Sequence, residues 1–217
     1  MPPSIDLIIF DLDGTLIDSL DDLTDAVNHM LSALGRERLT RDAVRTMVGQ
    51  GARRLVERAM PGGAAAEIER GLELFLDYNR EHIAVRTAFY PGALEALARF
   101  RGQGKRMAVI SNKNVDLCRS VLVALGAEQW FEEIMGADSL PARKPSPEPV
   151  LKLLADFGVP RERAVIIGDS INDVAAGKGA GVTTVGCTWG YGERSEIADA
   201  DYLVDTYGAL VTLPLFA

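Results

Sequence analysis

Short apolar runs recur along this sequence, and segments with helical periodicity lie between most of them. The runs expected to form strands are residues 5–10, 107–110, the weaker 133–135, 164–167 and 183–185. The segments expected to form helices are residues 92–100, 115–125, 147–157 and 172–180. Strands that are apolar throughout are buried on both faces, and parallel strands need crossover connections, usually helices. This alternation therefore predicts a parallel sheet covered by helices on both faces.

Residues 17–87 interrupt the alternation, because they contain no convincing strand and several helical patterns. Apolar residues recur at three- and four-residue spacing from Leu20 to Leu34, and the pattern ends at Gly35. Further helical patterns cover residues 44–48, 52–60 and 64–83. The predicted fold class is α/β, with a Rossmann-like parallel sheet core and an inserted all-helical cap domain. The core is expected to comprise residues 1–16 and 88–217, and the cap residues 17–87.

Composition limits the classes of partner. The formal net charge of −8 argues against a nucleic-acid partner, because a phosphate backbone is bound by clustered lysine and arginine. The apolar runs are too short to cross a bilayer, and no basic region precedes an apolar stretch near the N-terminus. The two cysteines, Cys118 and Cys187, lack metal-ligand spacing. A cytoplasmic protein without a membrane partner, either a monomer or a homodimer, is expected.

The strongest motif contains Asp11 and Asp13 and follows the first predicted strand directly. Ligands of open parallel sheets bind beyond the carboxyl ends of the strands, where this motif is expected to lie. Gly14 gives the backbone the freedom to turn sharply, so the two carboxylates can face different directions. The alternatives are a solvated acidic loop or a calcium loop. An EF-hand loop has glycine at its sixth position and a helix before it, whereas here glycine is fourth and a strand precedes.

Other polar segments follow later predicted strands. Ser111 and Asn112 come after residues 107–110, and Lys144 lies in a proline-rich loop after the weak strand. Asp169 and Asp173 follow residues 164–167. Taken singly, these segments are also typical of a turn, an exposed lysine and a helix start. Because each follows a separate strand, their order along the chain favours a shared site at one edge of the sheet.

The motifs together resemble those of the haloacid dehalogenase superfamily. The matching segments are residues 11–15, Ser111, Lys144 and residues 168–173. Within the superfamily, the chain most resembles phosphoglycolate phosphatases. This narrower likeness rests on features shared in part with related phosphatases: residues 13–19, residues 48–51 before the helical segment 55–59, Lys144-Pro145, and residues 168–170.

The resemblance implies a magnesium-dependent phosphatase that acts on a small phosphorylated metabolite. Asp11 would be the nucleophile and would carry an aspartyl-phosphate. Asp13 would protonate the leaving oxygen and then activate water. The ligands of Mg²⁺ would be the Asp11 carboxylate, the Asp13 backbone carbonyl and Asp169, while Asp173 would orient a metal-bound water or Lys144. An acid at position 13 also favours phosphoryl transfer over dehalogenation, since a halide leaves without a proton.

The resemblance also assigns the residues that would bind the substrate. Lys144 and the Ser111 hydroxyl would hold phosphate oxygens, helped by the amides of Gly14 and Asn112. In the cap, Gly49, Gly51 and Arg53 are candidates for specificity, because a helix N-terminus beside an arginine can bind an anion such as a carboxylate. The alternative for Arg53 is a solvated helix face.

Other functions on the same architecture stay open. The preferred substrate by resemblance is 2-phosphoglycolate, and a pyrophosphatase or nucleotidase is an alternative within the hydrolases. A sugar-phosphate mutase of the β-phosphoglucomutase type is another, although such mutases usually carry a bulkier aliphatic residue in place of Thr15. A phospho-acceptor signalling domain is a non-enzymatic alternative, and Asp13 and the helical insert argue against it.

Overall fold

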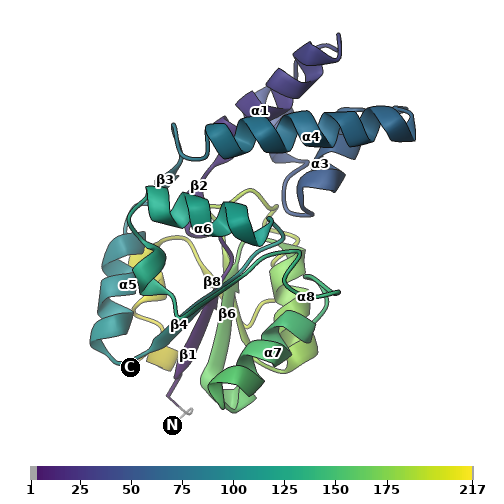
Figure 1. The fold of residues 1–217 in the computed structure, drawn as a ribbon. Coiled ribbons are helices and arrows are strands. Elements are labelled where there is room, and N and C mark those ends of the chain that lie inside the picture. The colour runs from purple at the N-terminus through teal and green to yellow at the C-terminus, as the bar shows by residue number, and fades with distance from the viewer. Residues whose placement is uncertain (1–3, 217) are drawn as a thin grey trace.

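A parallel sheet forms the centre of the molecule in the computed structural model, which describes residues 4–216 (Figure 1). Residues 1–3 and 217 of the expected core ranges therefore lie outside the described part of the chain. The sheet has six strands in the order β5-β4-β1-β6-β7-β8, and every neighbouring pair is parallel. The strands are β1 Leu7–Phe10, β4 Arg106–Ile110, β5 Glu133–Met135, β6 Ala164–Gly168, β7 Thr183–Cys187 and β8 Tyr202–Val204. The predicted α/β fold class is confirmed.

Helices cover both faces of this sheet. They are α5 Ala93–Gly102, α6 Val115–Ala124, α7 Glu148–Phe157, α8 Ile171–Ala180 and α9 Tyr207–Leu210. Ile8 and Phe10 of β1 pack with α5, α6 and α9, whereas Leu7 and Ile9 pack with α7 and α8. Because successive side chains of a strand point to opposite faces, a continuously apolar strand contributes to two cores. Each fully buried side chain of this kind contributes about 1.5–3 kcal/mol.

Four helices form a separate group beyond the carboxyl ends of the strands (Figure 1). They are α1 Leu20–Ala33, α2 Arg41–Arg45, α3 Ala52–Ala59 and α4 Ala65–Glu81. Their apolar faces meet in a hydrophobic cluster of their own, with Val27, Val56 and Phe75 among its buried members. We propose, on this basis, that residues 17–87 act as a cap over the sheet domain.

The chain enters and leaves the helical group through a two-stranded antiparallel ribbon. Strand β2 Ile17–Asp18 pairs with β3 Ala88–Phe89. Asp22, at the start of α1, accepts hydrogen bonds from the backbone N–H groups of Arg86 and Thr87 and from the Thr87 hydroxyl at 2.7–3.1 Å. The outgoing and returning segments are therefore fastened to each other.

Several expectations from the sequence need correction. The helix expected over residues 44–48 begins earlier, at Arg41, because the Thr40 hydroxyl accepts a hydrogen bond from the Ala43 backbone N–H at 3.2 Å. Residues 46–50 form turns, since Gly49 has a φ of +105°. The ribbon β2-β3 and the edge strand β8 were not expected. Short turns of 3₁₀-helix occupy Glu128–Trp130, Arg161–Arg163 and Pro214–Phe216. Among residues 4–216, no helix is both long and apolar enough to span a membrane.

Candidate active site

Asp11 lies at the carboxyl end of β1, in the middle of the sheet. Its backbone N–H donates to the Ile167 carbonyl at 2.9 Å, which continues the pairing with β6. One carboxylate oxygen accepts from the Leu12 N–H at 2.7 Å and lies 2.9 Å from the Lys144 ammonium. The carboxylate is therefore fixed in direction. The side chain keeps 12% of its surface exposed, so its remaining lone pairs face the site.

Lys144 is a buried cation between two carboxylates. Its ammonium lies 2.9 Å from Asp11 and 2.6 Å from Asp173, and its side chain is only 1% exposed. Burial alone would lower the pKa of Lys144, but the two carboxylates outweigh this effect and hold the pKa above its usual range. A permanent positive charge is thus maintained beside Asp11, where it can offset the charge of a bound anion.

Asp169 follows β6 and is held by a loop from the far end of the chain. Its oxygens accept hydrogen bonds from the Thr15 hydroxyl at 3.2 Å and from the backbone N–H groups of Tyr191 at 2.6 Å and Gly192 at 3.2 Å. Burial and, to a smaller extent, the charge of Asp173 raise the pKa of Asp169 to about 6, against the opposing effect of these hydrogen bonds. Burial likewise raises the pKa of Asp11 to about 8, with Lys144 opposing and the charges of Asp173 and Asp169 adding to the rise.

These carboxylates can hold a divalent cation. One oxygen each from Asp11, Asp169 and Asp173 lies within 4.8 Å of the others. An all-oxygen donor set suits Mg²⁺, and a dication among the carboxylates would favour their ionised forms. Both oxygens of Asp173 already have partners, since one accepts from Lys144 and the other from the Ser170 N–H and hydroxyl at 3.1 and 2.8 Å. The partners of Asp169 are all uncharged donors, and Asp11 contacts Lys144 through one oxygen only, so these two are the better placed direct ligands, while the charge of Asp173 is offset by Lys144.

Asp13 faces the cavity from the turn after β1. Its oxygens accept a hydrogen bond from the Ser19 hydroxyl at 2.5 Å and contact the Lys113 ammonium at 3.2 and 3.3 Å. Gly14 makes this turn with a φ of +85°, and a Cβ atom there would lie 2.5 Å from an Asp169 oxygen. A side chain at position 14 would therefore collide with the Asp169 carboxylate and displace it.

Ser111 and Asn112 follow β4 and reach the same site. Ser111 is buried, and its hydroxyl accepts a hydrogen bond from the Lys113 N–H at 3.3 Å. The Asn112 side chain donates to the carbonyls of Gly49 at 2.9 Å and Lys144 at 3.0 Å. It thereby joins the Lys144 loop to the loop that precedes α3. The structure thus brings Asp11, Asp13, Gly14, Ser111, Asn112, Lys144, Asp169 and Asp173 together at one edge of the sheet.

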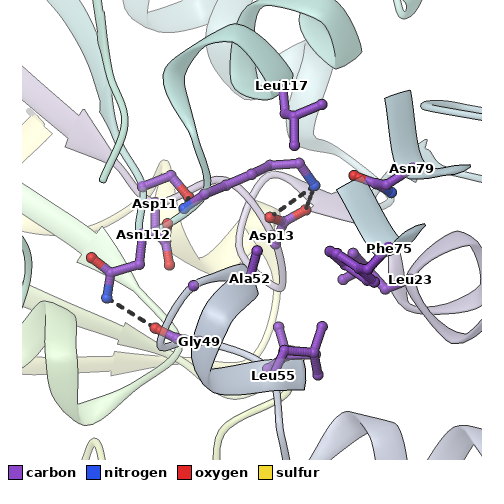
Figure 2. A pocket seen from close by; sticks show the side chains of 14 residues that line it. Asp11, Asp13, Leu23, Gly49, Ala52, Leu55, Phe75, Asn79, Asn112 and Leu117 are labelled. Atoms are coloured by element: carbon purple, nitrogen blue, oxygen red, sulfur yellow. Dashed lines mark hydrogen bonds and ion pairs between the residues drawn. The ribbon is translucent and has the colours of Figure 1, made fainter. Parts of the chain in front are cut away.

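Two cavities lie where the helical group meets the sheet. The smaller has a volume of about 50 Å³ (Figure 2). It is lined by Asp11, Asp13, Ser111, Asn112, Lys113 and Leu117 from the sheet domain and by Leu23, Val48, Gly49, Gly51, Ala52, Leu55, Phe75 and Asn79 from the helical group. The larger, of about 380 Å³, shares Asp11 and Asp13 and extends past Asp169 toward Arg45 and Arg58. A substrate bound to Asp11 would therefore be enclosed by both parts of the chain.

The cap residues predicted from the sequence are only partly brought to this site. Gly49 and Gly51 line the smaller cavity. Arg53 lines neither cavity, because its guanidinium is paired with Glu69 of α4 at 2.7 and 2.9 Å, and its side chain is 47% exposed. Arg45 donates to the carbonyls of Gly190 and Tyr191 instead, across the boundary between cap and sheet domain.

Three polar residues of the site were not assigned a role from the sequence. Lys113 directly follows Ser111 and Asn112, so its position in that motif was a usable signal. Ser19 is the last of the residues 13–19 that carry the family likeness, and it lies six positions after Asp13, so it too had a usable signal. Asn79 carries no such signal, because its proximity to the cavity depends on how α4 packs.

Comparison with known proteins shows which protein family has sequences similar to this chain. A family model described as haloacid dehalogenase-like hydrolase matches residues 8–187. A phosphoglycolate phosphatase of Psychrobacter arcticus is 37% identical over 94% of this chain and 94% of its own length. A phosphoglycolate phosphatase of Neisseria meningitidis is 38% identical over 91% of this chain and 86% of its own.

A solved structure agrees with these relatives. The crystal structure of a predicted phosphoglycolate phosphatase from Haemophilus somnus superposes with a TM-score of 0.92 at 32% identity. The superposition covers 95% of this chain and 96% of that one. Both the sheet domain and the helical group are therefore shared with this structure.

Proposed function

The chain belongs to the haloacid dehalogenase-like hydrolase family, and from this premise we propose that it hydrolyses 2-phosphoglycolate with Mg²⁺ through an aspartyl-phosphate on Asp11. It is a phosphoric monoester hydrolase, as its curated relatives are. The observation that carries the proposal is the position of Asp11, which lies 2.9 Å from a buried ammonium and beside the Asp169 carboxylate. A carboxylate in this setting can approach a phosphate whose charge is neutralised.

The first step transfers the phosphoryl group to the protein. An Asp11 oxygen forms a bond to phosphorus as the bond from phosphorus to the leaving oxygen breaks, and Asp13 donates the proton that the leaving alkoxide takes. Lys144 and the Ser111 hydroxyl hold the non-bridging oxygens, whose charge the buried ammonium offsets. The Asp11 and Asp169 carboxylates would hold Mg²⁺, and the ion would place further positive charge beside the same phosphate oxygens.

The second step restores Asp11. Asp13, now a carboxylate, removes a proton from a water molecule that attacks phosphorus, and the bond from phosphorus to the Asp11 oxygen breaks. Inorganic phosphate and the alcohol are the products. Asp13 can serve both steps because it lies in the turn directly after the nucleophile and faces the cavity.

The helical group controls access to this chemistry. Leu23, Leu55 and Phe75 form apolar walls of the smaller cavity. Apolar walls lower the polarity around the site, which strengthens the electrostatic interactions inside it. Asp11 and Asp13 line both this cavity, of about 50 Å³, and the larger one of about 380 Å³, so the leaving group would lie between the sheet domain and the helical group.

A substrate panel tests the proposal. Phosphate release is measured with Mg²⁺ for 2-phosphoglycolate, pyrophosphate, nucleoside monophosphates and β-glucose 1-phosphate. We expect kcat/KM to be at least about tenfold higher for 2-phosphoglycolate, because a tenfold preference needs only about 1.4 kcal/mol of selective transition-state binding. A higher value for any other compound, or isomerisation of the sugar phosphate without phosphate release, would overturn it. Removal of Mg²⁺ with EDTA is expected to abolish turnover.

A further inference from the structure

Asn79 is a buried polar residue of α4 that the proposed chemistry does not use. The residue is only 3% exposed, and its Oδ1 atom has no hydrogen-bond partner among residues 4–216. It lines the smaller cavity, and Figure 2 shows its carboxamide oxygen on the side that faces Asp13. Because a carboxamide oxygen accepts hydrogen bonds and donates none, the partner that Oδ1 lacks is a donor.

A second asparagine of the cap shows what a purely structural role looks like. Asn28 of α1 donates to the Leu39 carbonyl at 2.9 Å and accepts from the Leu39 N–H at 2.7 Å. The oxygen of that carboxamide is thus satisfied by the protein, and Asn28 lines neither of the two cavities. Since a buried acceptor without a donor lowers stability, the fold explains Asn28 and does not explain Asn79.

Lys113 is the cationic donor among the residues that line the same cavity. Its side chain is 9% exposed, and its ammonium contacts the two Asp13 oxygens at 3.2 and 3.3 Å. The backbone of Lys113 is held, because its N–H donates to the Ser111 hydroxyl and its carbonyl accepts from the Ala137 N–H. The ammonium lies at the end of a flexible stem and is therefore the part of Lys113 that can move.

The contact between Lys113 and Asp13 occupies the carboxylate that has to meet the leaving oxygen. Asp13 Oδ1 accepts from the Ser19 hydroxyl at 2.5 Å and also contacts Lys113. For Oδ2, the ammonium of Lys113 is the partner that the described residues supply. Departure of the ammonium would therefore free Oδ2, while Ser19 still holds the carboxylate in its direction.

An ammonium that leaves Asp13 needs another acceptor in the cavity. Apolar side chains such as Phe75 form much of the wall, and an ammonium without a hydrogen bond is unfavourable there. Asn112 also has an unpaired carboxamide oxygen, but its NH₂ group is fixed on two backbone carbonyls, and Figure 2 shows the oxygen turned away from Asp13. The Oδ1 atom of Asn79 is thus the better placed acceptor.

We propose that Asn79 is a positioning residue whose Oδ1 accepts the Lys113 ammonium when Asp13 exchanges that contact for the leaving oxygen. The inference rests on the proposed function, in which Asp13 is the acid. It adds a residue of the cap that acts through Lys113 and does not touch the substrate.

Single-turnover kinetics with two leaving groups tests this role. The rate of phosphoryl transfer is measured with Mg²⁺ for 2-phosphoglycolate, whose alkoxide needs a proton, and for p-nitrophenyl phosphate, whose nitrophenolate does not. Asn79→Leu is expected to slow transfer from 2-phosphoglycolate by about tenfold, because a hydrogen bond to a charged group is lost. Transfer from p-nitrophenyl phosphate should change by less than about twofold. Asn79→Ala, with a smaller side chain, is expected to show the same difference.

Binding and double variants separate positioning from other roles. The Kd of 2-phosphoglycolate, measured by calorimetry in the Asp11→Asn background, is expected to change by less than about twofold on Asn79→Leu. In the Lys113→Met background, Asn79→Leu should change either rate by less than about twofold, because the ammonium is absent. Asn28→Leu is the matched control, expected to lower Tm and to leave the ratio of the two rates unchanged.

Equal slowing of both substrates by Asn79→Leu, or no slowing of either, would overturn the inference. So would a loss that persists in the Lys113→Met background, or weaker binding of 2-phosphoglycolate with unchanged transfer. The proposed function fails separately, if the wild-type chain releases no phosphate from 2-phosphoglycolate. The comparison is then made with a nucleoside monophosphate, whose alkoxide also needs a proton.

Discussion

Asp13 is held by two partners before any substrate is bound. Ser19 donates to one of its oxygens, and the Lys113 ammonium contacts both. A general acid must exchange at least one of these contacts for the leaving oxygen. The contribution of Asp13 to the rate therefore depends on how much the leaving oxygen needs a proton.

Asp13→Asn tests this role through the leaving group. For the alkoxide of 2-phosphoglycolate, we expect kcat to fall by about 10²–10⁴-fold, the usual contribution of a positioned acid or base. For p-nitrophenyl phosphate, the phosphoryl-transfer step needs no proton and is expected to be much less affected in single-turnover kinetics. Equal losses of this step for both substrates would remove Asp13 from proton transfer.

The positions of the site residues in the sheet domain could be predicted from the sequence. Asp11, Lys144 and Asp169 each follow a strand, and the carboxyl ends of parallel strands meet at one edge. Arg53 was placed by analogy with a helix terminus, but side-chain direction decides its role, and it faces Glu69. Asn79 could not be found, because nothing local marks one buried asparagine of α4 as unpaired.

At the scale of elements, the joint between cap and sheet domain depends on one buried carboxylate. Asp22 is 4% exposed and accepts hydrogen bonds from Arg86 and Thr87, next to β3. Asp22→Ala leaves the donors of the buried Thr87 and the backbone N–H of Arg86 without this partner, and it is expected to lower the free energy of unfolding by about 2–4 kcal/mol, measured by urea denaturation. The exposed Asp25, which pairs with Arg86, is the control. Asp25→Ala should change the free energy of unfolding by less than about 1 kcal/mol. Similar losses for both variants would contradict this assignment.

The guanidinium of Arg45 connects α2 to the loop that holds Asp169. It donates to the carbonyls of Gly190 and Tyr191, and the backbone N–H of Tyr191 donates to Asp169. Arg45→Met is therefore expected to lower kcat/KM for 2-phosphoglycolate by about threefold to tenfold, as expected for one or two hydrogen bonds. Arg53→Met breaks only an exposed ion pair with Glu69, so its kcat/KM should stay within about twofold of the wild-type value. A larger loss for Arg53 than for Arg45 would reverse this interpretation.

Elements with strong periodicity were predicted well, and weak ones were not. The expected β4, β6 and β7 segments agree with the structure within about two residues, because continuous apolar runs leave few alternatives. Strand β8 escaped prediction since it has only three residues, one of them the exposed Leu203. The ribbon β2-β3 has two residues per strand, and its pairing joins segments that are far apart in sequence.

At the scale of the whole molecule, we propose that the sheet domain carries the chemistry and that the helical group limits which substrates reach it. The central strand β1 is buried on both faces, so Asp11 starts from a rigid element. The groups proposed to act on the phosphate come from the ends of β1, β4 and β6 and from the Lys144 loop. The walls that meet the leaving group come largely from α1, α3 and α4.

The central claim is that the phosphoryl group passes through Asp11, and the Asp13→Asn variant with p-nitrophenyl phosphate tests it most directly. Because this substrate needs no acid, the first step proceeds, while the loss of the base slows hydrolysis of the aspartyl-phosphate. We predict a burst of about one p-nitrophenolate per protein molecule, with a phosphoryl group found by mass spectrometry on the peptide that contains Asp11. The burst should be absent in the double variant Asp11→Asn/Asp13→Asn. A burst that persists in the double variant, or a phosphoryl group on any other residue, would contradict the account.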